Sequence, residues 1–261
     1  MLFEFDGEKY KKASSHQKEW ANNILEELSF HGNEAILDLG CGDGAITNQL
    51  AEMVPSGKVI GIDASEGMIK TALKYRKLQN VYFEQKDINE IKYVNEFDFI
   101  FSNATLHWVK DHNKLLNNSF QALRNKGTLR FNFAGDGNCA YFFKVIRQVM
   151  SENRYSQYFE EFSWPWFMPT IEEYKQLIEE ASFYQIEVWG ENADRYFKDS
   201  DSMIKWIDQP SIVPFLRCVP ENEKKNFRNY VVERMLEETK QEDGTYFETF
   251  RRINVKATKG C

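Results

Sequence analysis

The sequence predicts an α/β fold, a doubly wound and mostly parallel sheet of seven strands. Two observations carry this prediction. Short apolar runs alternate with helical periodicities through residues 35–134, the pattern of parallel strands joined by helical crossovers. The first run ends in glycines at positions 40, 42 and 44, a spacing that lets a strand turn tightly into a helix. The predicted architecture is Rossmann-like, with an antiparallel last strand and a helical, aromatic-rich insertion.

The elements of this core can be placed in chain order from their periodicity. Trp20, Ile24 and Leu28 recur at helical spacing, so an amphipathic helix is expected over 15–30. Apolar runs bounded by turn residues mark strands, and apolar residues repeating at helical spacing mark helices. The expected strands are Ala35–Leu39, Lys58–Asp63, Val81–Gln85, Phe97–Asn103, Gly127–Ala134 and Phe183–Trp189, and the expected helices are Ala45–Met53, Glu66–Leu78, Asn113–Leu123, Ala140–Glu152 and Thr170–Ala181.

The residue composition of the sequence changes after residue 151. Aromatic residues crowd positions 155–167, where packing is favoured over a role in lining a ligand pocket. Residues 199–240 read as helix broken by prolines, an insertion suited to act as a lid, and 245–257 alternate after a glycine turn like an antiparallel edge strand. The expected segments are 1–30 (N-terminal helix over the site), 31–152 (core), 153–198 (aromatic segment, helix and strand), 199–244 (helical insertion or lid) and 245–261 (edge strand and tail).

The composition is that of an ordinary globular protein. The chain has 261 residues, 42% of them hydrophobic, which suffices for one α/β domain with an insertion. A formal net charge of −7 argues against nucleic acid as a partner, and no apolar run has transmembrane length. The N-terminus lacks a signal-peptide core, and the four cysteines show no metal-ligand spacing. These observations favour a cytoplasmic protein without a metal site.

The glycine loop and the acid after the second strand indicate a nucleoside ligand. Gly40 and Gly42 precede a helix, and Asp63 ends the next apolar run roughly 20 residues on, where a carboxylate can bind ribose hydroxyls. With Ala45 at the third position, the loop also satisfies the loose dinucleotide fingerprint. An NAD-dependent oxidoreductase is therefore an alternative at this point.

Three further acids argue against a dinucleotide as the ligand. Asp38 lies two residues before the first glycine and Asp43 lies inside the loop, where both would repel a pyrophosphate and attract an ammonium group. Asp87 follows the third strand, where a carboxylate can meet the amino group of adenine. A ligand with adenosine at one end and an amino acid at the other is S-adenosylmethionine, which is the expected cofactor.

Four motifs carry a resemblance to a known family. They are LDLGCGDG at 37–44, GIDAS at 61–65, QKDI at 85–88 and FSNATLHWV at 101–109. Together they resemble class I S-adenosylmethionine-dependent methyltransferases over residues 10–134. The LHWV segment resembles the small-molecule branch that includes the trans-aconitate and juvenile hormone acid methyltransferases. No Pro-Pro-aromatic tetrad is present after the fourth strand, which argues against methylation of adenine bases.

The resemblance implies a role for each residue of the cofactor site. Asp63 would accept hydrogen bonds from both ribose hydroxyls, and Asp38 would bind the methionine ammonium or orient the loop. Cys41 is expected to be a small packing residue rather than a reactive thiol, and a core role fits the helical spacing of Met68 equally well. The implied cofactor-binding residues are Asp38, Gly40, Cys41, Gly42, Asp63, Ala64, Met68, Asp87, Ile88 and Asn103.

The acceptor side is implied at His107, Trp108 and Gln17. Resemblance to acid-methylating relatives places Trp108 and Gln17 in the substrate pocket, whereas His107 would bind a substrate carboxylate or act as a base. By itself a His-Trp pair is more often a packing feature. A carboxylate is already ionised near neutral pH and needs no general base, and no strong base constellation accompanies His107, so a carboxylate acceptor is favoured. Arg154 and Arg195 are further candidates to bind it.

The expected function is transfer of a methyl group from S-adenosylmethionine to a small molecule, with a carboxylate favoured over other oxygen, nitrogen or carbon nucleophiles. This reaction is an in-line displacement in which positioning supplies most of the catalysis. The alternatives are the NAD-dependent oxidoreductase and a non-catalytic protein that binds S-adenosylmethionine. Neither a nucleic acid nor a membrane is an expected partner.

Overall fold

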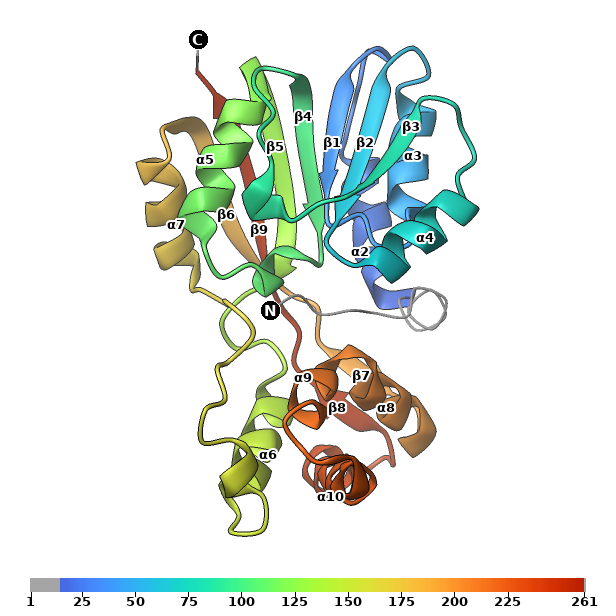
Figure 1. Cartoon of the computed structure of the whole chain (residues 1–261), viewed down its shortest axis with the longest axis vertical. Helices are drawn as coiled ribbons and strands as arrows, with labels where there is room; N and C mark the ends of the chain where they lie inside the picture. The colour runs from blue at the N-terminus through green and yellow to red at the C-terminus, as the bar shows by residue number, and fades with distance from the viewer. Residues whose placement is uncertain (1–14, 261) are drawn as a thin grey trace. The chain divides into compact units, whose positions relative to one another are not determined.

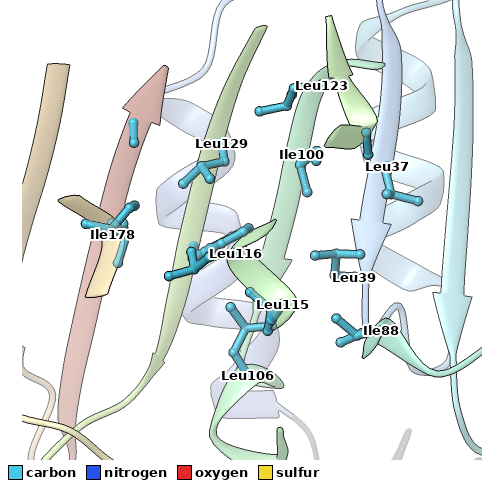
Figure 2. Close-up of a cluster of buried hydrophobic side chains, with 14 of the residues drawn as sticks. Leu37, Leu39, Ile88, Ile100, Leu106, Leu115, Leu116, Leu123, Leu129 and Ile178 are labelled. Carbon is cyan, nitrogen blue, oxygen red and sulfur yellow. The ribbon is translucent and has the colours of Figure 1, made fainter. Parts of the chain in front are cut away.

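A computed structural model of the chain describes residues 15–260, with side chains for 20–208 and 211–260. The main sheet contains β1 (Ala35–Leu39), β2 (Lys58–Asp63), β3 (Val81–Gln85), β4 (Phe97–Asn103), β5 (Leu123–Ala134), β6 (Phe183–Asn192) and β9 (Arg251–Lys259). Their order is β3-β2-β1-β4-β5-β9-β6 (Figure 1). Strands β1 to β5 pair in parallel, while the arrow of β9 runs opposite to those of β1 and β2 (Figure 2). The predicted fold class is therefore confirmed.

Helices cover both faces of the sheet, as a doubly wound fold requires. They are α2 (Ser15–Glu26), α3 (Ala45–Met53), α4 (Glu66–Lys74), α5 (His112–Ala122) and α7 (Ile171–Glu180), with short turns η1 (Ile88–Glu90) and η2 (Leu106–Trp108). On one face the strands form a buried cluster with α5 and α7 that includes Leu37, Leu116 and Ile178 (Figure 2). On the other face they cluster with α2 and α3 through Ile36 and Leu50. Among the described residues no helix is long and apolar enough to cross a membrane.

Local sequence explains why these elements begin and end where they do. Ile36 and Leu37 point to opposite faces of β1 and are both fully buried, so apolar residues follow one another in this strand instead of alternating with polar ones. The hydroxyl of Ser65 accepts a hydrogen bond from the N–H of Met68 and caps the start of α4. Because the first strands are parallel, their carboxyl ends meet at one edge of the sheet, where such folds bind ligands.

The chain divides into two compact units. The sheet unit comprises the described residues up to 135, 166–190 and those from 253 on, and the insertion unit comprises 136–165 and 191–252. The insertion unit contains α6 (Ala140–Ser151), η3 (Ser156–Tyr158), β7 (Arg195–Phe197), α8 (Ser200–Trp206), the π turn η4 (Ile207–Ser211), α9 (Val213–Leu216), α10 (Glu221–Thr239) and β8 (Tyr246–Glu248). These unit boundaries differ from the expected segment ends at 152 and 198, because α6 groups with the insertion unit.

Aromatic packing holds the insertion unit together. Tyr155 and Phe159 are buried, and their rings lie 5.0 and 5.6 Å from the ring of Phe227 in α10. Trp164 meets the ring of Phe143 edge-on at 5.1 Å. Such pairs add to the stability that burial of the rings already provides. The predicted packing role of the aromatic segment is therefore confirmed for these side chains.

The expected edge strand over 245–257 is wrong in two respects. The segment forms two strands, since β8 pairs antiparallel with β7 in a separate two-stranded sheet while β9 joins the main sheet. Strand β9 also lies between β5 and β6 rather than at an edge. Both of its faces are buried: Ile253 lies in the apolar cluster, and the amide oxygen of Asn254 accepts hydrogen bonds from Arg130 and Asn132. Strand β9 is therefore an interior strand of the main sheet.

Replacing Glu248 with alanine is expected to destabilise the insertion unit by about 1–3 kcal/mol. The buried Glu248 carboxylate accepts hydrogen bonds from the N–H groups of Tyr141 and Phe142, at 3.2 and 2.9 Å, in the first turn of α6. The N-cap residue of this helix, Cys139, makes no side-chain capping bond, so the donors would lose the acceptor that Glu248 supplies. Urea denaturation measures the change, with the exposed Glu160→Ala as control. A loss no larger than the control's, about 0.5 kcal/mol, contradicts this role.

Candidate functional site

The glycine loop between β1 and α3 is attached to the end of β2 and to the turn after β4. The N–H groups of Gly40 and Cys41 both donate to the carbonyl of Ile62, at 2.8 and 2.9 Å. Gly40 has a φ of +75°, and a Cβ there would lie 2.1 Å from Cγ2 of Thr105. Position 40 therefore requires glycine both for its conformation and for space. The hydroxyl of Thr105 donates to the carbonyl of Gly40 at 3.1 Å, so three strand ends form one connected structure.

Asp63, the last residue of β2, connects the glycine loop with the start of α4. Its carboxylate accepts hydrogen bonds from the N–H of Gly42 at 3.0 Å and from the N–H of Ser65 at 2.9 Å. Bonds of this charge-assisted kind are stronger than neutral ones and fix the carboxylate at the carboxyl edge of the sheet. The structure thus brings Asp63 to the loop, as the spacing of the motif predicts.

Asp38 is buried in β1 beside the same loop. Its side chain accepts a hydrogen bond from the hydroxyl of Thr47 at 2.7 Å. Burial raises the pKa of Asp38 to about 7, the Thr47 hydrogen bond partly offsets this rise, and the charge of Asp63 adds to it. No lysine or arginine in the described part of the chain forms an ion pair with Asp38. A buried carboxylate in this setting favours a ligand group that is cationic.

The thiol of Cys41 packs inside the loop. A Cβ added at Gly61 would lie only 2.8 Å from the Cβ of Cys41, so the loop rests directly on β2. Burial raises the pKa of the Cys41 thiol, and the charges of Asp63 and Asp38 raise it further. The thiol is therefore protonated and unreactive at neutral pH, which fits the predicted packing role.

The residues expected beside adenine follow β2 and β3. The N–H of Lys86 donates to the carbonyl of Asp63 at 3.0 Å, which holds the chain before Asp87 against the end of β2. Asp87 caps η1 by accepting from the N–H of Asn89, and Ile88 is buried in the sheet's apolar cluster (Figure 2). Met68 is also buried, in the first turn of α4, so the structure gives it the core position that its helical spacing allowed.

Asn103 is the last residue of β4, and the turn that follows carries His107 and Trp108. Ala104 has a φ of +56° and its N–H donates to the carbonyl of Asn132 in β5 at 2.7 Å, which ends the strand after Asn103. His107 and Trp108 are partly buried in η2, and their rings lie 5.8 Å apart. Beyond them, the ring of Trp166 lies 5.2 Å from that of Trp108. The structure therefore attaches an aromatic group to the same edge of the sheet as the glycine loop.

His112 is a residue of this region that sequence reasoning missed. Its ring is buried at the start of α5, with one nitrogen 3.0 Å from the carbonyl of Leu106 in η2 and the other 3.2 Å from the hydroxyl of Tyr174. Burial lowers the pKa of His112 to about 4, so the ring is neutral at pH 7. A histidine beside Asp111 at a polar helix start resembles an exposed cap, and no signal in the sequence marks it as buried.

The other predicted residues belong to α2 and to the insertion unit. Gln17 belongs to the first part of α2, and its side chain lies outside the described part of the chain. Arg154 and Arg195 belong to the insertion unit, where the guanidinium carbon of Arg154 lies 3.8 Å from the ring centre of Tyr230. Across the residues with described side chains, no group of three or more His, Cys, Asp and Glu is placed to hold a metal ion.

The sequence of this chain is similar to those of several known proteins. A family model described as a methyltransferase domain matches residues 30–200. The chain is 28% identical over 255 residues to an uncharacterized methyltransferase of Schizosaccharomyces pombe, covering 96% of each. It is 27% identical to the trans-aconitate 2-methyltransferase of Escherichia coli over 96% of each chain, and 28% identical to the juvenile hormone acid O-methyltransferase of Bombyx mori over 79% of this chain and 78% of that one.

A solved structure shares the fold. A phosphoethanolamine N-methyltransferase of Haemonchus contortus, solved in complex with S-adenosyl-L-methionine, matches with a TM-score of 0.62 at 19% identity. The match covers 98% of this chain and 57% of that chain. Identity this low supports the fold and not the substrate.

The Asp38→Asn variant is expected to lose less stability than the wild type as pH rises. A carboxyl whose pKa is raised by folding binds its proton more tightly in the folded state, so its contribution is full below about pH 4 and is lost on the way to about pH 7. The loss amounts to at most about 1.4 kcal/mol per pH unit in that window. Asparagine cannot ionise, yet its oxygen can still accept from Thr47.

The measurement is the free energy of unfolding of both proteins in urea between pH 5 and 8. Glu248 and His112 titrate in both proteins, so their contributions cancel in the difference. Parallel pH profiles for the two proteins would show that Asp38 ionises as freely in the fold as in the unfolded chain.

Proposed function

The chain belongs to the methyltransferase-domain family, and from this premise we propose that it transfers the methyl group of S-adenosylmethionine to a carboxylate oxygen of a small molecule. S-adenosylmethionine-dependent methyl transfer is the chemistry of this family, which excludes the NAD-dependent oxidoreductase that the glycine pattern alone allowed. The choice of acceptor rests on two relatives whose names specify trans-aconitate and juvenile hormone acid, both carboxylic acids, and which align over most of the chain.

The observation that supports this cofactor site best is the pair of acids around the glycine loop. Asp38 is a buried carboxylate without an ion-pair partner among the described residues. The ammonium group of S-adenosylmethionine would supply the positive charge that such a partner provides. Asp63 is held by the N–H groups of Gly42 and Ser65. A carboxylate can accept several hydrogen bonds at once, so two ribose hydroxyls would donate to its oxygens.

The rest of the cofactor site is assigned by proximity to these acids. The backbone of Gly40 and Cys41 would face the amino-acid part, since the loop lies at the end of β1 beside Asp38. Ala64, Met68, Asp87 and Ile88 would surround adenine, because they follow β2 and β3 next to Asp63. Asn103, at the end of β4, would lie near the sulfonium.

Trp108, His107 and Gln17 would form the acceptor side. Trp108 lies on the turn after β4 and packs against Trp166 from the segment before α7, and the turn is bonded to the glycine loop through Thr105. When bound, S-adenosylmethionine supplies a methyl group activated by a positively charged sulfur. The acceptor oxygen forms a bond to this carbon as the carbon–sulfur bond breaks, leaving S-adenosylhomocysteine. Because a carboxylate is already ionised, the residues of this side have only to hold it in line and exclude water.

A methyl-transfer assay tests the proposal. The protein is incubated with S-adenosylmethionine labelled in the methyl group and with a panel of trans-aconitate, malonate, laurate, small amines and phenols. Transfer to at least one acid is expected, and its label should be released as volatile methanol in base, because a methyl ester hydrolyses there and an N-methyl group does not. Label confined to base-stable products contradicts a carboxylate acceptor. Cofactor binding without transfer to any compound supports the non-catalytic alternative.

The Asp63→Ala variant is expected to bind S-adenosylhomocysteine about 100-fold more weakly or not at all. Two charge-assisted hydrogen bonds to the ribose and the anchoring of Gly42 are lost together, and each charged bond contributes about 1.5–3 kcal/mol. Calorimetry measures the affinity, and Asp201→Ala on the insertion unit is the control. Affinity within twofold of the wild type would refute the ribose assignment.

The Trp108→Ala variant is expected to reduce kcat/KM for the acceptor at least about tenfold while leaving the affinity for S-adenosylhomocysteine within about twofold. The indole would contact the acceptor and not the cofactor, so its loss would act on transition-state positioning. The matched control is Trp189→Ala, a tryptophan of β6 that is 37% exposed. If cofactor affinity falls and turnover of bound substrate does not, Trp108 belongs to the cofactor side.

A further inference from the structure

His112 binds the turn that carries His107 and Trp108 through a hydrogen bond to its backbone. The ring of His112 is 3% exposed, and its Nε2 lies 3.0 Å from the carbonyl oxygen of Leu106, the first residue of the turn. The same carbonyl accepts the N–H of Val109 at 2.9 Å. Two donors therefore converge on one carbonyl, and this fixes the orientation of the peptide that precedes His107.

The hydrogen-bond partners determine which nitrogen of His112 carries the proton. A carbonyl oxygen can only accept, so Nε2 must be the donor to Leu106. In a neutral imidazole the other nitrogen is then an acceptor, and Nδ1 accepts from the hydroxyl of Tyr174 at 3.2 Å. The donors run in one direction, from the Tyr174 hydroxyl through the imidazole to the Leu106 carbonyl. The Leu106 carbonyl thus selects the tautomer, and the Tyr174 hydroxyl, which can donate or accept, satisfies Nδ1 in that tautomer.

Aromatic rings from three other segments enclose this histidine. The rings of Phe167, Tyr174 and Phe133 lie 4.6, 5.3 and 5.6 Å from that of His112. Tyr174 and Phe133 are fully buried, so the imidazole cannot change rotamer without displacing packed side chains. Phe167 also supports the turn directly, since its N–H donates to the carbonyl of His107 at 2.8 Å. The turn is therefore held at two successive carbonyls, one through His112 and one through Phe167.

We propose that His112 is a positioning residue, whose Nε2–H and its partner Tyr174 hold the Leu106 carbonyl so that the turn presents His107 and Trp108 to the acceptor. The effect on the reaction rests on the proposed function, whereas the hold on the turn does not. His112 takes no part in proton transfer itself. It is buried away from solvent behind the turn and is neutral at pH 7, because burial lowers its pKa to about 4.

Amide hydrogen exchange and nitrogen-15 NMR of the full chain test the hold on the turn. In the wild type, the imidazole shifts should show Nε2 protonated and Nδ1 unprotonated. In His112→Phe, which keeps a ring of similar size, the amides of Val109 and Phe167 should exchange at least about fivefold faster, the factor that one ordinary hydrogen bond represents. In Tyr174→Phe, which removes only the hydroxyl, the same two amides should move in the same direction. Amides of β2 should not change in either variant.

The control is Tyr155→Phe, which removes a hydroxyl from a buried tyrosine of the insertion unit and should leave the Val109 and Phe167 amides unchanged. Protonated Nδ1 in the wild type overturns the proposal, as does unchanged exchange in both variants. If His112→Phe does not fold, the proposal is decided by the tautomer of His112 in the wild type and by the exchange rates of the Val109 and Phe167 amides in Tyr174→Phe.

Turnover then separates positioning from a purely structural role. With the acid of the panel that the wild type methylates best, His112→Phe and Tyr174→Phe should lower kcat while the affinity for S-adenosylhomocysteine, measured by calorimetry, stays within about twofold. Faster exchange with unchanged kcat overturns the positioning role. If the wild type methylates no acid, the proposed function fails while the tautomer and the exchange rates still decide whether His112 holds the turn.

Discussion

The carbonyl of Ile62 and the carboxylate of Asp63 hold the glycine loop at the end of β2, and the geometry of the site depends on this attachment. Two successive N–H groups of the loop share the carbonyl, and a third binds the carboxylate. A side chain at position 40 or 61 would disturb these contacts. A Cβ added at Gly40 or Gly61 would lie closer to a neighbouring side chain than real Cβ atoms do. These contacts hold the backbone of the loop in place, and we propose that this backbone faces the cofactor.

The second consequence of this attachment is electrostatic. Beside the fixed loop, Asp38 is buried and accepts a hydrogen bond from the hydroxyl of Thr47. The negative charge of Asp63 raises the pKa of Asp38 further. A folded protein keeps such a carboxylate at a cost in stability, and binding of a cationic group offsets that cost. Charge is therefore the property by which we propose that this loop selects an amino acid joined to a nucleoside, where an ordinary dinucleotide site would accept a pyrophosphate.

The sequence allows the core of the fold to be predicted closely for a physical reason. Strands β1, β2 and β4 are buried on both faces over most of their length, so their apolar runs stop where the strands stop. The split of the last predicted strand could not be seen, because alternation continues from β8 through the break into β9. The interior place of β9 was equally hidden, since it depends on Asn254 meeting Arg130, 124 residues earlier in the chain.

Asp38, Asp63 and Asp87 could be located from the sequence because they lie at or next to the ends of predicted strands, whereas the buried position of His112 could not be predicted. Its environment is built from α7, β5 and the segment before α7, none of which is near it in sequence. The most direct test of the central claim is calorimetry of S-adenosylhomocysteine binding at pH 7 in two buffers of different ionisation enthalpy. If the ligand ammonium meets Asp38, binding releases about half a proton per site in the wild type and none in Asp38→Asn, because a pKa of about 7 leaves the free carboxyl half protonated. Equal proton exchange in the two proteins would contradict the claim that Asp38 receives the charge of the cofactor.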